Sequence, residues 1–171
     1  MIGRRSLLIW PVAALAIRLD GQLRDTQRLA FTGIGPVRIG MTEAQVRSVL
    51  KQRIERTDLE EGCSYLTGVA GGVAFMLLDS RVARVDITHG SWLTEAGAGI
   101  GTSEAEIRRL YPRVRVEPHP YFDEGLGHYL RVTPSAPTLS DYELLFESEK
   151  GKVTSFRAGL SRAVSLIEGC A

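Results

Sequence analysis

Residues 39–47 read IGMTEAQVR, and residues 100–108 read IGTSEAEIR. Both copies fit the pattern I-G-x-[TS]-E-A-[QE]-[VI]-R, and apolar residues follow at helical spacing in each. A segment that recurs in this way indicates an internal duplication, in which each copy opens one structural unit. The chain of 171 residues has room for two such units.

Each copy carries a signal for the start of a helix. Thr42 with Gln45, and Ser103 with Glu106, match the capping box, in which the two side chains satisfy backbone N–H groups reciprocally. The first helix is expected to end near residues 51–54. The second is expected to end at about Tyr111, because proline follows it.

Apolar and alternating runs after each helix predict antiparallel strands. We therefore expect an α+β fold of two tandem repeats, each a helix or helix pair packed on an antiparallel sheet. The units are residues 33–92 and residues 93–171, the second including a C-terminal tail and about ten inserted loop residues. The expected strands are residues 63–66, 73–78, 82–88, 114–116, 129–132, 142–147 and 153–158.

The N-terminus has the features of an export signal. Two arginines precede an apolar run over residues 7–17, and residues 14–16 form an A-x-A site. The run is shorter than the roughly 20 residues that span a bilayer, so no transmembrane segment is expected in the mature chain. We predict a signal peptide over residues 1–17, a flexible linker over residues 18–32, and a periplasmic or secreted location. The alternative is a buried or frayed N-terminal segment.

The chain has two cysteines, Cys63 and Cys170. An even count in an exported chain predicts a disulfide, which would tie the C-terminal tail to the first unit. In a cytosolic protein they would be two unrelated thiols.

The composition is that of an ordinary globular protein, 44% hydrophobic and 24% charged, with a net charge of +1. This charge gives no electrostatic footprint for nucleic acid, so no nucleic-acid partner is expected.

The segment Ile39-Gly40-Met41-Thr42 with Val46, followed by antiparallel strands, resembles the small-protein-A/OmlA type of envelope domain. In tandem on a chain of this length it is similar to the beta-lactamase inhibitory protein fold. The resemblance implies an exported, non-catalytic protein-interaction module, envelope-associated or inhibitor-like, whose protein partner is unknown.

Aromatic side chains in predicted loops are the candidate contact residues, because such residues often anchor interfaces. They are Trp92 between the units, and His119, Tyr121 and Phe122 in the loop inserted in the second unit. The competing interpretation has Trp92 and Phe122 folding back onto the core.

No catalytic residue, resident metal or cofactor is expected from the motifs. The alternative function is a small-molecule or metal-dependent binding protein, or an enzyme, that uses the loop over residues 119–128. In that case His119, Asp123 and His128 would converge, although their spacing matches no known ligand signature.

Overall fold

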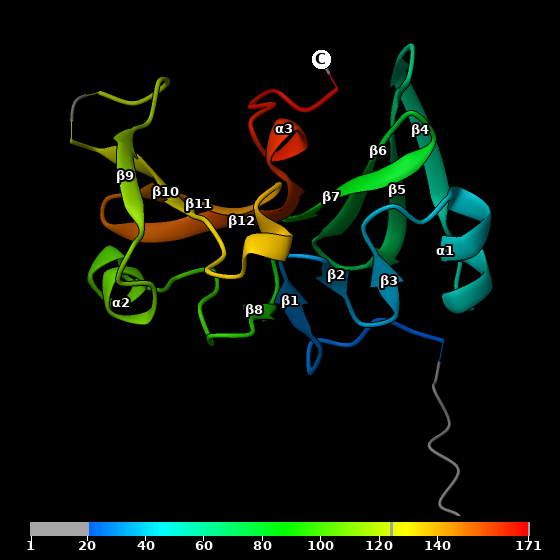
Figure 1. The fold of residues 1–171 in the computed structure, drawn as a ribbon, viewed down its shortest axis with the longest axis horizontal. Helices are drawn as coiled ribbons and strands as arrows, with labels where there is room; N and C mark the ends of the chain where they lie inside the picture. The colour runs from blue at the N-terminus through cyan, green and yellow to red at the C-terminus, as the bar shows by residue number, and fades with distance from the viewer. Residues whose placement is uncertain (1–20, 124, 171) are drawn as a thin grey trace, which may run out of the picture.

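A large antiparallel sheet dominates the computed structural model, which describes residues 21–123 and 125–170. Its eight strands lie in the order β4-β5-β6-β7-β12-β11-β10-β9, and every neighbouring pair is antiparallel. Strands β7 and β12 meet at its middle, with the first four strands on one side and the last four on the other (Figure 1). The strands are β4 (Glu55–Glu60), β5 (Cys63–Ala70), β6 (Val73–Leu78), β7 (Arg81–Ile87), β9 (Arg115–Pro118), β10 (Gly127–Val132), β11 (Tyr142–Glu149) and β12 (Lys152–Leu160).

A second, smaller sheet has the strand order β3-β2-β1-β8. In this sheet β1, which precedes the first repeat, pairs in parallel with β8, which lies at the connection between the repeats. Its buried side chains, Leu29 and Ile34 among them, belong to the main core. The strands are β1 (Arg28–Ala30), β2 (Gly33–Ile34), β3 (Val37–Arg38) and β8 (Leu93–Thr94).

The helices are short: α1 (Glu43–Val49) and α2 (Glu104–Leu110) have seven residues each, and α3 (Ser161–Val164) has four. A single 3₁₀ turn, η1 (Pro137–Leu139), lies between β10 and β11. The prediction of an α+β fold built from helix-on-sheet repeats is therefore wrong, and the described structure is mostly β. The physical reason is that two-turn helices offer little surface: α1 buries only Val46 and α2 only Ile107.

Both predicted helix starts are present. Thr42 and Gln45 form the complete capping box at α1. At α2 the box is half formed: Ser103 accepts from the Glu106 N–H at 3.2 Å, but the Glu106 carboxylate pairs with Arg109 instead.

The duplicated segment makes the same contact in both halves. The N–H of Gly40 donates to the carbonyl of Val82 at 2.7 Å, and the N–H of Gly101 donates to the carbonyl of Val153 at 2.8 Å. The repeated I-G-x-[TS] therefore fastens the start of each helix to the last strand of its own half, β7 or β12.

The sheet has two unlike faces. Its inner face carries the main core, with Phe75, Val85, Phe146 and Phe156 almost completely buried. Its outer face is covered in part by α3 and by the tail formed by residues 165–170, which we call the C-terminal tail.

The predicted disulfide is confirmed. Cys63 on β5 and Cys170 are bonded, with their Cα atoms 5.5 Å apart and a sequence separation of 107. The bond fastens the C-terminal tail to the first half of the sheet.

The structure describes only part of the N-terminal region for which a signal peptide and a linker were predicted. The predicted signal peptide, residues 1–17, lies outside the described residues. The described part of the predicted linker is not irregular throughout, because Leu29 on β1 is 2% exposed and pairs with two strands. Within the described residues, no helix has the length and apolar character needed to cross a membrane.

Candidate functional site

Trp92 is part of the core rather than of an exposed surface. Its side chain is 4% exposed, and its Nε1–H donates to the Gly71 carbonyl at 2.8 Å. It thus holds the turn between β5 and β6 against the connection between the two halves. The competing prediction, that Trp92 folds back onto the core, is confirmed, and the expectation of an exposed aromatic side chain at this position is not met.

His119 is also buried, with 8% exposure. Its ring packs against Phe122 and Tyr129, with centroids 4.5 Å and 4.4 Å away. Its Nδ1 accepts from the backbone N–H of Tyr121 at 3.3 Å, which places the proton of the neutral ring on Nε2. His119 therefore packs on the buried side of the β9–β10 loop, and its own side chain is not exposed.

Tyr121 and Phe122 do lie on the surface, with 63% and 39% exposure. Phe122 is seated beside the backbone of Gly127, where an added Cβ would lie 2.4 Å from the Phe122 ring. Glycine is required there because a side chain would displace the ring. The loop thus presents its two aromatic residues in a defined arrangement.

Exposed apolar side chains gather on this loop and on the C-terminal tail. Among the described residues six large hydrophobic side chains are exposed, and five belong to these two segments. The two segments are joined directly, because the Tyr121 hydroxyl donates to Glu168 Oε1 at 2.5 Å. We call this set the apolar patch; its members are Tyr121, Phe122, Leu126, Leu166 and Ile167.

Three members of the apolar patch were not predicted from the sequence. The exposure of Leu126 could have been predicted, since a leucine between two glycines in a polar loop has no strand or helix to bury it. Leu166 and Ile167 have no such signal, because their exposure depends on how the C-terminal tail lies on the sheet.

The histidine and acid set of the alternative function is not brought together. His128 Nδ1 lies 2.8 Å from Glu104 Oε1, at the first turn of α2, whereas His119 faces the aromatic rings and Glu147. Across residues 21–123 and 125–170, no group of three or more His, Cys, Asp or Glu side chains could hold a metal ion.

Glu104 also accepts a hydrogen bond from Ser148. Ser148, His128 and Glu104 are the residue types of a hydrolase catalytic triad, but they are not arranged as one. Ser148 is fully buried and donates its proton to the Glu104 carboxylate at 2.6 Å, so it faces neither imidazole nor solvent. Burial raises the pKa of Glu104, but the hydrogen bonds from Ser148 and His128 outweigh it and hold that pKa below its ordinary value. The cluster ties α2 to β10 and β11.

Two arginines attach the C-terminal segment to the outer face of the sheet. Arg84 on β7 donates to the carbonyls of Ala163 and Leu166, at 2.7 and 2.8 Å. Arg157 on β12 donates to the Val164 carbonyl at 2.9 Å. The carbonyls of Ala163 and Leu166 also accept from the backbone N–H groups of Leu166 and Gly169, so Arg84 adds a second donor to each.

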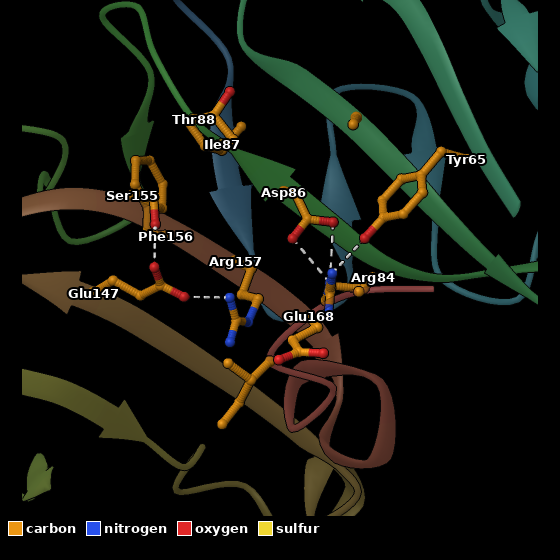
Figure 2. Close-up of a pocket in the computed structure, with 13 residues that line it drawn as sticks. Tyr65, Arg84, Asp86, Ile87, Thr88, Glu147, Ser155, Phe156, Arg157 and Glu168 are labelled. Atoms are coloured by element: carbon orange, nitrogen blue, oxygen red, sulfur yellow. Dashed lines mark hydrogen bonds and ion pairs between the residues drawn. The ribbon is translucent and has the colours of Figure 1, made fainter. Parts of the chain in front are cut away.

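The same two arginines form ion pairs within the sheet. Arg84 pairs with Asp86 at 2.9 Å, and Arg157 pairs with Glu147 at 2.5 Å (Figure 2). Burial raises the pKa of Asp86 and opposes the effect of the Arg84 charge. Burial likewise raises the pKa of Tyr65, whose hydroxyl accepts from Arg84 at 2.5 Å.

No family model matches the chain, and no curated protein matches it. The disulfide is compatible with an exported protein.

Proposed function

We propose that this chain is an exported, non-catalytic protein-interaction module, periplasmic or secreted, that contacts its partner through the apolar patch. The observation that carries the proposal is the concentration of five of the six exposed large hydrophobic side chains on two adjoining segments. Contiguous exposed apolar surface on a folded protein commonly marks an interaction site.

The two segments that form the apolar patch are held in place by the rest of the chain, so they should lose little conformational entropy when a partner binds. His119 and Gly127 position the loop from beneath, and the disulfide holds the tail beside it. A surface that is already ordered loses less entropy on binding, which favours affinity.

The charges beside the patch indicate the kind of partner. Asp123 lies in the loop and Glu168 in the tail, while Lys150 in the adjoining β11–β12 turn is already paired with Glu149 at 3.2 Å. The carboxylates of Asp123 and Glu168 would complement a partner that presents an apolar surface flanked by lysine or arginine.

We also propose kinship with the tandem small-protein-A/OmlA and beta-lactamase inhibitory protein group. The support is the order of elements, since one short helix followed by four antiparallel strands occurs twice. The duplicated segment makes the same hydrogen bond in each half.

The test is partner capture by matched leucine variants. Tagged protein captures a stoichiometric partner from envelope or culture fractions, and the purified pair is then measured by titration calorimetry. Leu126→Ser in the patch should weaken binding at least about tenfold, because a hydrophobic contact residue is lost. Leu59→Ser, at an exposed site on β4 outside the patch, should leave the affinity unchanged.

Equal binding by both variants, with both folded, would remove the apolar patch as the contact surface. Melting temperatures of the two variants should match that of the parent, because both leucines are exposed.

A further inference from the structure

His119 contacts both of the aromatic residues that the β9–β10 loop contributes to the apolar patch. Its side chain is 8% exposed, and its ring centroid lies 5.9 Å from that of Tyr121 and 4.5 Å from that of Phe122. Its backbone carbonyl also accepts from the N–H of Phe122 at 3.3 Å. The arrangement of residues 119–122 therefore depends on the state of this one buried histidine.

The hydrogen bond between His119 and Tyr121 requires a neutral imidazole. Nδ1 of His119 accepts from the backbone N–H of Tyr121 at 3.3 Å, and among the described residues this N–H has no second acceptor. Both nitrogens of a protonated histidine carry a proton, so neither of them can accept a hydrogen bond. Protonation of His119 would therefore set two donors against each other and remove this bond.

The carboxylate next to His119 acts in the same direction. Nε2 of His119 lies 4.0 Å from Oε2 of Glu147 on β11. This oxygen accepts from Ser155 at 3.1 Å, while the other oxygen of Glu147 accepts from Arg157 at 2.5 Å. A protonated ring would be attracted toward Oε2 of Glu147, and so away from the Tyr121 N–H, because Nδ1 and Nε2 point in different directions.

The other charged and titratable groups around the ring keep their charge state near neutral pH. Histidine ordinarily changes its charge between about pH 5 and pH 8, whereas carboxylates and arginine ordinarily do so well outside this range. Burial is the main cause that raises the pKa of Tyr129, and the hydrogen bond to Glu168 is the main cause that raises the pKa of Tyr121, so both hydroxyls stay neutral. These groups come from the loop, β10, β11, β12 and the C-terminal tail, and they are Tyr121, Tyr129, Arg131, Glu147, Arg157 and Glu168.

We propose that His119 is a pH-sensitive switch for the apolar patch: the neutral ring orders residues 119–122, and protonation releases them. This inference rests on the proposed function, since its consequence is that the protein holds its partner near neutral pH and releases it in acid. Tyr121 and Phe122 lose their fixed arrangement when the ring is protonated, so more conformational entropy is lost on binding and the affinity falls.

The first test follows the loop itself and needs no partner. NMR of the full folded chain records the protonation of the His119 ring and the protection of the Tyr121 amide from solvent exchange, between about pH 8 and pH 5. Protection, taken relative to the intrinsic exchange rate at each pH, should be lost as His119 gains its proton. Contacts of the Phe122 ring with Gly127 should weaken over the same range. The proposal is overturned if His119 stays neutral throughout, or if it gains a proton while the protection of Tyr121 is unchanged.

Two variants separate the hydrogen bond from the charge. In His119→Asn, the side-chain oxygen replaces Nδ1 as the acceptor and cannot gain a proton, so the Tyr121 amide should stay protected across the whole range. His119→Phe keeps an aromatic ring but has no acceptor, so the amide should be unprotected at every pH. His89→Asn removes an exposed histidine and should leave the response of the parent unchanged. A pH response in His119→Asn equal to that of the parent overturns the proposal, and the parent titration decides it if a variant fails to fold.

The consequence for binding is tested with the captured partner. The parent should bind about tenfold more weakly at about pH 5 than at about pH 8, and His119→Asn should bind alike at both. Equal binding by the parent at the two pH values overturns the proposed release. Leu126→Ser tests the patch at a single pH, and the amide titration tests the switch without a partner, so failure of one proposal is distinguishable from failure of the other.

Discussion

The Tyr121 hydroxyl donates to Oε1 of Glu168, 2.5 Å away and 47 residues further along the chain. This hydrogen bond joins the β9–β10 loop to the C-terminal tail, and so holds the two parts of the apolar patch together. Glu168 also lines a pocket between the two halves of the sheet. Glu168 therefore connects the apolar patch to this pocket.

The Tyr121–Glu168 bond can be detected by titration. Its donation to Glu168 raises the pKa of Tyr121 above the ordinary value of 10.0, because ionised tyrosinate would face a carboxylate. In Glu168→Gln the pKa of Tyr121 should fall toward that ordinary value, as measured by NMR of labelled tyrosine. An unchanged pKa would show that the two side chains do not meet in solution.

The disulfide should contribute much of the stability of this chain. Cys63 and Cys170 are separated by 107 residues, and closing a loop of that length stabilises the folded state by about 4–5 kcal/mol in the chain-entropy model. Urea unfolding of the Cys63→Ser, Cys170→Ser double variant should show a loss of this order. A loss below about 1 kcal/mol would mean that the unfolded chain is already compact.

Trp92 should behave as a core residue. Trp92→Phe removes the donor to the Gly71 carbonyl and should cost about 1–3 kcal/mol, because that carbonyl loses its partner. Trp92→Ala should cost about 3–5 kcal/mol, since it also leaves a cavity. Thermal unfolding measures the loss of stability in both variants. If a Trp92 variant lost partner binding but kept its stability, Trp92 would be a contact residue instead.

The Glu104 cluster should make stability depend on acid pH. The pKa of Glu104 in the folded chain lies below its ordinary value of 4.5, so its contribution is complete above that value and is lost as the pH falls through the folded pKa. Glu104→Gln should therefore lower stability at pH 7 and flatten the acid limb of the stability curve. Glu60→Gln, at an exposed site, should leave the curve unchanged.

The two repeat glycines should have matching costs. Gly40 and Gly101 have φ values of +91° and +86°, and an added Cβ would meet nothing within 4 Å at either position. Alanine at either site should cost about 1–2 kcal/mol from backbone conformation alone. Urea unfolding of the two single variants measures this, and clearly unequal costs would mean that the repeats do not play equivalent roles.

Much of the eight-stranded sheet was predictable from local pattern. The run at residues 73–78 coincides with β6, and the alternating run at residues 82–88 lies one residue from β7. β4 was missed, because its six residues are all exposed and mostly charged at the edge of the sheet. Such an edge strand carries no buried face that periodicity could reveal.

The candidate site was less predictable than the fold. Tyr121 and Phe122 are exposed, as expected for aromatic residues in a loop, but Trp92 is also an aromatic residue in a predicted loop and lies in the core. Sequence pattern could not separate them, because burial depends on which segments pack over a loop and not on the loop itself. The pocket between β7 and β12 could not be predicted either, since its wall combines residues from β5, β6, β7, β11, β12 and the tail.

The sequence by itself determined the duplication, the start of each helix and the pairing of the two cysteines. The duplication and the helix starts depend on residues close together in the chain. The cysteine pairing follows because the chain has only two cysteines. Only the tertiary structure decided that the two halves merge at β7 and β12 into one sheet, and that residues 28–38 join β8 in a second. Those pairings are hydrogen bonds between backbone groups far apart in the chain. Every residue except proline has the same backbone donor and acceptor, so the pairings leave no local pattern in the sequence.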